Sequence, residues 1–236
     1  KDASSSRERV PDYEGGLMRS IVGLRIGVPE GYFDEDLDPD VALLIEGSLD
    51  VFKSRGARIL QVKIPDIVNK VAEIHPLVMK AEGSANHGAW KRAHAEEYSE
   101  EVGKRLEAGF FIPAVDYINA LQYRGAALQE FSDTVFSKVD VLHTPGLPMP
   151  VPSLADTDMA AGQGMPEMIA GLSWTTRSNN YLGIPSLAVP CGFTANGLPA
   201  GFQLMGRPFS EAQLFQLGHA YQGVTDWHTW VPEMST

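Results

Sequence analysis

The chain has 236 residues, of which 44% are hydrophobic and 21% charged, a composition typical of a folded globular protein rather than a disordered one. Its 30 acidic residues against 19 Lys and Arg give a formal net charge of −11. This acidic balance argues against binding of nucleic acid or of an anionic membrane surface through bulk charge. The single cysteine, Cys191, suits a reducing compartment, so we expect a cytoplasmic protein.

The first 20 residues are polar and contain Pro11, Gly15 and Gly16, which favour an exposed connector. The rest of the chain shows no internal repeat and no interior linker. We therefore expect a connector over residues 1–20 and one domain over residues 21–236.

A strand–helix–strand unit follows the connector. Residues 24–28 and 58–64 alternate apolar side chains with others, which is the period of a strand. Apolar residues recur at helical spacing between them, where Asp38 predicts an N-cap, Pro39 a first helical position and Gly56 a C-terminal stop. Such a unit indicates an α/β domain with a largely parallel sheet.

The middle of the chain is rich in predicted helix. Residues 67–108 carry helical patterns that Gly83, Gly88 and Gly103 are expected to interrupt. Residues 114–138 carry an apolar stripe that predicts one long helix.

Short strands dominate the last third. Residues 139–144 predict a buried strand, and a Pro-rich loop follows it. Residues 153–170 have weak periodicity and predict a mobile loop or a short helix. Residues 186–190 and 201–206 predict two strands joined by an Asn-Gly turn, and residues 211–221 predict a closing helix.

Sequence motifs by themselves reveal no catalytic set. The chain has no Gly-x-Ser-x-Gly nucleophile elbow, no phosphate-binding loop and no Gly-x-Gly-x-x-Gly fingerprint. Its six histidines show no metal-ligand spacing, and Cys191 fits a buried, unreactive thiol. We therefore assign neither a metal nor a cofactor. Gln203, on a predicted buried strand, needs polar partners.

Several motifs nevertheless resemble one family in the same order along the chain. The stretch Asn180-Tyr-Leu-Gly-Ile-Pro-Ser-Leu-Ala-Val-Pro, followed by Gly197-Leu-Pro-Ala-Gly-Phe-Gln-Leu-Met-Gly-Arg-Pro-Phe, closely resembles the C-terminal signature of the amidase signature family. Upstream, Val139-Asp-Val-Leu-His-Thr-Pro and Asp116-Tyr-Ile-Asn-Ala-Leu-Gln-Tyr-Arg124 resemble a strand and a helix of that family, and Gly23-Leu-Arg-Ile-Gly-Val-Pro resembles the strand that opens its C-terminal half.

The resemblance implies a fold and a reaction. The expected fold is part of the amidase signature fold, a mixed, mostly parallel central sheet with helices on both faces. The expected reaction is hydrolysis of a carboxylic amide C–N bond, with a Ser nucleophile, a second Ser in a cis peptide and a Lys. That Lys and the Gly/Ser-rich segment belong to the family's N-terminal half, and this chain contains neither. We therefore transfer no catalytic residue and expect the chain alone to be inactive.

The resemblance also suggests residues for one wall of a substrate pocket. Arg124 matches a position where an Arg can bind a substrate carboxylate, as in the glutaminase subunit of the tRNA-dependent amidotransferase. An equally good interpretation is that Arg124 forms a structural ion pair. His143 and Thr144 end a strand, where α/β sites tend to lie. Thr176 and Asn180 precede the signature strand and could face the same pocket.

Three functions remain open. The first is a stand-alone amidase, because the closing residues Thr225-Asp-Trp-His resemble the ending of such amidases. The second is the glutaminase subunit of the tRNA-dependent amidotransferase, and the third is a non-catalytic scaffold made of this half alone. The expected partners of an enzyme are a small-molecule amide and the missing N-terminal catalytic half. A homodimer is one option for assembly, and we expect neither direct nucleic-acid nor membrane binding.

Overall fold

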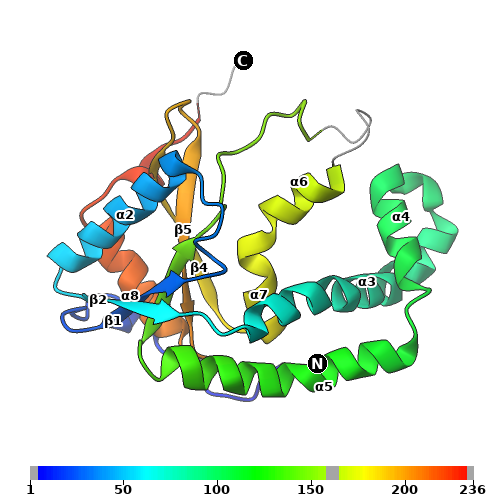
Figure 1. Cartoon of the computed structure of the whole chain (residues 1–236), viewed down its shortest axis with the longest axis horizontal. Coiled ribbons are helices and arrows are strands. Elements are labelled where there is room, and N and C mark those ends of the chain that lie inside the picture. The colour runs from blue at the N-terminus through cyan, green and yellow to red at the C-terminus, as the bar shows by residue number, and fades with distance from the viewer. Residues whose placement is uncertain (1–4, 158–164, 233–236) are drawn as a thin grey trace.

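The computed structural model describes residues 5–157 and 165–232 and shows one five-stranded sheet with helices on both faces (Figure 1). The strands lie in the order β2-β1-β3-β5-β4. Their bounds are β1 Arg25–Glu30, β2 Arg58–Lys63, β3 Val141–Pro145, β4 Ser186–Phe193 and β5 Pro199–Gly206. The helices are α1 Tyr13–Gly16, α2 Pro39–Ser54, α3 Ile67–Ala93, α4 Glu100–Gly109, α5 Ala114–Phe131, α6 Met165–Leu172, α7 Trp174–Leu182 and α8 Glu211–Gln222.

The sheet is mixed. β1 pairs in parallel with β2 on one side and with β3 on the other, with Ile26 opposite both Ile59 and Val141. β5 runs antiparallel to β3 and forms the predicted hairpin with β4, which is the edge strand. The predicted fold class, with a mixed sheet between two helical layers, is confirmed.

The helix between the two parallel strands begins and ends where its sequence signals predict. The Asp38 side chain accepts hydrogen bonds from the backbone N–H groups of Asp40 and Val41, and Pro39 occupies the first turn. Gly56, just past the end, has a φ of +88°, a conformation that favours glycine. α2 is therefore the crossover that joins β1 to its parallel neighbour β2.

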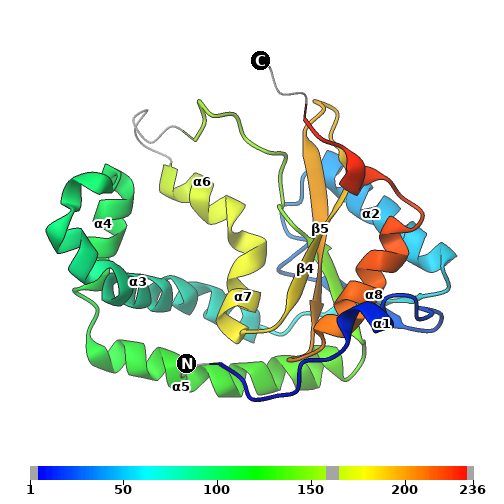
Figure 2. The ribbon, with the colours of Figure 1, turned by 180° about the vertical axis from the view of Figure 1, so that it is seen from behind.

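Each face of the sheet carries its own hydrophobic core. α2 and α8 cover one face and bury Phe52, Phe202 and Tyr221. α3, α5 and α7 cover the opposite face, and Figure 2 shows α3 and α5 lying side by side below α7. Phe131 and Tyr181 are buried in this second core, which we call the α3/α5/α7 face.

The predicted interruptions at Gly83, Gly88 and Gly103 are wrong, because α3 is continuous over 27 residues and Gly103 lies inside the 10-residue helix α4. Gly88 lies against the ring of Phe110, and Gly109 of α4 lies against the backbone of Lys80. Two helices approach closely at such contacts, so these glycines serve packing between α3 and α4 rather than helix termination.

Two other segments refine the expectations. Residues 165–172 form a short helix, one of the two alternatives for residues 153–170, while residues 158–164 lie outside the described part of the chain. The connector contains the helical turn α1 and packs on α8, where Gln216 Nε2 donates to the Ser20 carbonyl at 2.9 Å. No helix among the described residues is long and apolar enough to cross a membrane.

Candidate functional site

The N-terminus of α7 is held at the end of the sheet where β1, β2 and β3 finish. Thr175 Oγ1 donates to the Gly146 carbonyl at 2.7 Å, just after β3. Gln203 Nε2 donates to the carbonyls of Thr175 at 2.9 Å and of Pro145 at 3.2 Å. The polar partners predicted for Gln203 are therefore present. Sites of α/β proteins form at the carboxyl ends of parallel strands, and α7 is the element fixed there.

Tyr32 and Trp174 lock α7 to the loop after β1. The Tyr32 hydroxyl donates to the Trp174 carbonyl, and Trp174 Nε1 donates to the Tyr32 carbonyl, both at 2.9 Å. Their rings stack with centroids 4.3 Å apart. Tyr32 has a φ of +57°, which is unfavourable for an aromatic residue, and burial raises its pKa to about 12. The reciprocal contacts offset this backbone strain and fix the start of α7.

Arg124 lies on the α3/α5/α7 face. Its Cζ is 5.3 Å from the centroid of the Tyr181 ring, a cation–π distance, and its side chain is half-buried. Its Nε is enclosed and has no hydrogen-bond partner among the described residues. The Tyr181 hydroxyl in turn donates to the Ala120 carbonyl, which fixes the ring beneath the guanidinium.

Two further basic groups gather beside Arg124. His75 of α3 and Arg177 of α7 are both half-buried. Burial lowers the pKa of His75, and the positive charges of Arg177 and Arg124 lower it further. Arg177 Nε donates to Ser173 Oγ at 3.0 Å. Helices α3, α5 and α7 thus bring two guanidinium groups and an uncharged imidazole into one region.

His143 and Thr144 point to opposite faces of the sheet because they are neighbours on β3. His143 is 1% exposed and lies under α2, stacked on Phe202 with its Nε2 2.9 Å from Ser48 Oγ. Burial lowers its pKa to about 3. Thr144 faces α7, and its Oγ1 is 3.7 Å from Met205 Sδ. The structure therefore separates His143 from Arg124 and leaves Thr144 on the same side as Arg124.

Thr176 and Asn180 both lie on α7. Thr176 is half-buried, and its Oγ1 donates to the Ser173 carbonyl at 3.1 Å. Asn180 is exposed, whereas its neighbour Asn179 is buried and donates to Ser186 Oγ at 2.9 Å and to Gln203 Oε1 at 3.2 Å. The asparagine that ties α7 to the sheet is thus one residue before the one singled out in the sequence.

Sequence reasoning missed Tyr32, His75, Trp174 and Arg177. They come from three separate stretches of the chain, and no spacing rule links them. One usable signal was the placement of Arg177 and Tyr181 one helical turn apart, which puts both on one face of α7.

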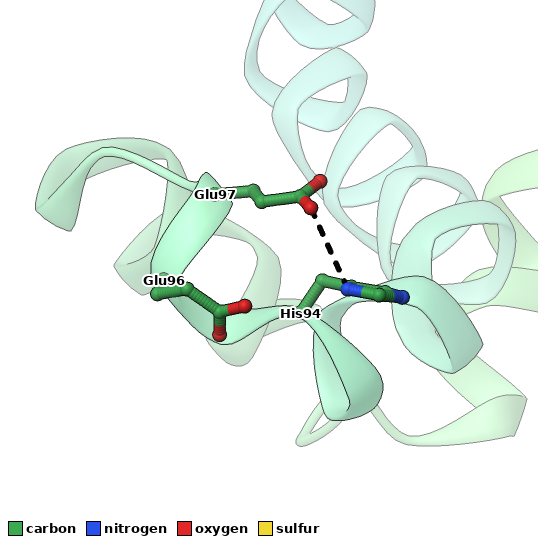
Figure 3. Close-up of side chains that lie close together, drawn as sticks. All are labelled: His94, Glu96 and Glu97. Atoms are coloured by element: carbon green, nitrogen blue, oxygen red, sulfur yellow. Dashed lines mark ion pairs between the residues drawn. The ribbon is translucent and has the colours of Figure 1, made fainter.

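One cluster has the composition of a metal site. Figure 3 shows His94, Glu96 and Glu97 around the turn after α3, with one potential ligand atom of each within 4.8 Å of the others. The Glu97 carboxylate is already 3.5 Å from His94 Nδ1 and accepts a hydrogen bond from Trp90 Nε1 at 3.1 Å. These contacts explain the arrangement as a surface ion pair with a hydrogen bond.

The geometry so far places Arg124, Arg177 and His75 on the α3/α5/α7 face of the sheet. The model of the Amidase family matches residues 1–215 of the chain. The chain belongs to the amidase family. Among similar proteins, a subunit of the glutamyl-tRNA(Gln) amidotransferase of Halorhodospira halophila is 34% identical over 257 residues, covering 99% of this chain and 51% of that protein. An amidase of Pseudomonas putida is 32% identical over 234 residues, covering 99% of this chain and 50% of that protein.

Solved amidase structures share the fold. A bacterial aryl acylamidase of the amidase signature family superposes with a TM-score of 0.74 at 21% identity, covering 94% of this chain and 48% of that one. A 6-aminohexanoate cyclic dimer hydrolase gives a TM-score of 0.78 at 16% identity, covering 96% of this chain and 50% of that one. The amidase-family chain spans about half the length of the relatives it matches.

Proposed function

We propose that this amidase-family chain supplies the substrate-recognition half of an enzyme that hydrolyses carboxylic amide C–N bonds. The observation that carries the proposal is the half-buried guanidinium of Arg124, which lies over the ring of Tyr181 near the C-terminal end of α7. A partly desolvated guanidinium needs a partner, and its fork is suited to a carboxylate. The enzyme's amides therefore carry a carboxylate that Arg124 binds.

The alternative role of Arg124 as a structural ion pair receives no support from the contacts. Among the described residues, no carboxylate lies within ion-pair distance of its guanidinium. The chain has 30 acidic residues, so the absence of such a partner is not explained by a shortage of acids. Thr144 and Thr176 lie on the same side of the sheet and are the neutral groups we assign to the same pocket.

The chemical step is assigned to the part of the enzyme outside this chain. Within the described residues, no Lys Nζ is hydrogen-bonded to a Ser Oγ, as the Ser–cis-Ser–Lys relay would require. This half therefore binds and orients the amide, while the nucleophile, the proton relay and the oxyanion donors come from the N-terminal half.

An apolar groove offers a surface for that missing half. It lies between the loop after β3 and the β4–β5 hairpin, with a volume of about 420 Å³, and is lined by small and apolar residues that include Leu147, Met149 and Pro190. Contact with the rest of the enzyme would remove this apolar surface from water.

A glutaminase subunit is the second candidate. The relatives named as glutamyl-tRNA(Gln) amidotransferase subunits favour it, and a carboxylate-binding Arg124 is equally consistent with glutamine, whose α-carboxylate lies in the same small molecule as its side-chain amide. A partner that accepts the released ammonia would then be required. A scaffold without activity is the third, and it would need no N-terminal half.

Amide hydrolysis by the chain alone and by the chain combined with an amidase-family N-terminal half, called the longer protein below, tests the proposal. A panel of neutral and carboxylate-bearing amides, glutamine included, should be hydrolysed by the longer protein and not by the 236-residue chain. Hydrolysis of glutamine that depends on a second protein would favour the second candidate. Turnover by the chain alone that disappears when one of its own serines is mutated would contradict the division of labour.

A further inference from the structure

The surroundings of Arg124 contain a second cation that the proposed function does not use. Arg177 and Tyr181 lie one turn apart on α7, and Arg124 of α5 sits over the Tyr181 ring at 5.3 Å. Both guanidinium groups are close enough to His75 of α3 for their charges to act on it. Three helices thus place two cations around one imidazole.

Neither arginine is neutralised by the protein around it. Arg177 Nε donates to Ser173 Oγ at 3.0 Å, and within residues 5–157 and 165–232 its two terminal nitrogens have no protein acceptor. No carboxylate of these residues forms an ion pair with Arg124 or Arg177. His75 adds no third charge at neutral pH because its pKa is lowered. Among the described residues, the region therefore holds two guanidinium groups without an ion-pair partner, in a chain whose net charge is −11.

Such an arrangement is unfavourable without an anion. Like charges at half-buried positions repel one another and lose part of their hydration. The protein nevertheless holds α7 rigidly in place, with Tyr32, Trp174 and Gln203 fixing its first turn. A preorganised pair of guanidinium forks is an arrangement suited to binding negative charge, because the repulsion is relieved only when the anion arrives.

We infer that Arg177 is a second specificity-determining residue, which acts with Arg124 to bind the acidic end of amides that carry two carboxylate groups. This inference rests on the proposed function, in which Arg124 alone requires one carboxylate. Two guanidinium groups balance two carboxylates, whereas a substrate with one carboxylate would leave a positive charge uncompensated. The substrates expected are amides that keep two free carboxylates, such as N-acyl derivatives of amino dicarboxylic acids or monoamides of tricarboxylic acids.

Binding of small acids to the chain tests the inference independently of hydrolysis. Succinate carries two carboxylates and butyrate one, and both have four carbon atoms. By isothermal titration calorimetry at low ionic strength, the wild-type chain should bind succinate about tenfold to hundredfold more tightly than butyrate, the effect of one charge-assisted pair. Arg177→Gln should reduce succinate affinity to that of butyrate, and Arg124→Gln should weaken both acids.

Arg207 offers a matched control, because its guanidinium also lies over an aromatic ring, 5.6 Å from the centroid of Phe136. Arg207→Gln should keep the succinate preference. Thermal unfolding shows whether each variant is folded. If Arg177→Gln is not folded, Arg177→Lys takes its place and must lose succinate affinity severalfold while butyrate affinity stays unchanged, because Lys keeps the charge and loses the fork.

Three results would overturn the inference: equal affinity of the wild type for both acids, no binding of either, or an unchanged preference in the Arg177 variant. None of these results would contradict the proposed hydrolysis of amides with a single carboxylate by the longer protein. A clear succinate preference without any amide hydrolysis would instead contradict the proposed function and leave the two-arginine site standing.

Discussion

His143 should make the stability of the fold depend on pH. Ser48 Oγ donates to the Ile45 carbonyl at 2.7 Å, so its remaining role toward His143 Nε2, 2.9 Å away, is to accept. The imidazole is therefore neutral with its proton on Nε2, and its Nδ1 has no partner among the described residues. A second proton would have to be buried on Nδ1 without an acceptor, which is why burial lowers the pKa to about 3.

The sign and the size of the effect follow from linkage. In the unfolded chain His143 has an ordinary pKa of about 6.5, so below that pH the unfolded state binds a proton that the folded state does not. The stabilisation is complete above pH 6.5 and is lost as the pH falls toward 3. At 1.36 kcal/mol per pH unit, the loss between pH 7 and pH 5 is about 2 kcal/mol.

Urea unfolding between pH 7 and pH 5 measures this loss. His143→Gln removes the titrating group and keeps a side-chain amide that can donate to Ser48. Between pH 7 and pH 5, the free energy of unfolding of the variant should therefore fall by about 2 kcal/mol less than that of the wild type. His75 also has a lowered pKa, and comparison with the variant cancels its contribution. The same substitution at the exposed His228 is the control for removing a histidine. If the free energy of unfolding changes with pH equally in the wild type and in His143→Gln, the reasoning is refuted.

Two further predictions concern the frame of the site. Gln203→Leu removes three hydrogen bonds and leaves buried carbonyl and amide groups unpaired, so the free energy of unfolding in urea should fall by about 3 kcal/mol or more. The control Gln216→Leu, on the surface of α8, should lower it by under about 1 kcal/mol. Similar losses for both variants would contradict the role given to Gln203. Cys191 is 5% exposed, and burial raises its pKa to about 12, so a thiol reagent should label it only in the unfolded chain. Rapid labelling of the folded chain at neutral pH would show that this part of the core opens.

Local signals predicted most of the sheet and its first crossover. Asp38, Pro39 and Gly56 mark the ends of α2 because capping and positive φ depend on residues within one turn. The same reasoning predicted a helix break at Gly88, where there is none. This glycine instead leaves room for Phe110, just past the end of α4. A glycine that permits close packing and one that ends a helix look alike in sequence.

The site was harder to predict than the fold because it depends on which face each residue takes. Both faces of the sheet are covered, so His143 and Thr144 are equally buried, and apolar alternation could not assign either to the pocket. Asn179 and Asn180 are adjacent on a nine-residue helix, too short for periodicity to fix its inner face. Arg124 lies on the long helix α5, three residues after Leu121 and four before Leu128, and this spacing places it beside the apolar residues of the helix, where it is half-buried.

The measurement that tests the central claim most directly is the substrate discrimination of Arg124→Gln in the longer protein. Its KM for carboxylate-bearing amides should rise about tenfold to hundredfold, the effect of one charge-assisted pair, with neutral amides of the same shape unchanged. An equal loss of activity on both kinds of amide, with a melting temperature several degrees lower, would show that Arg124 serves the fold and that this half does not recognise a carboxylate.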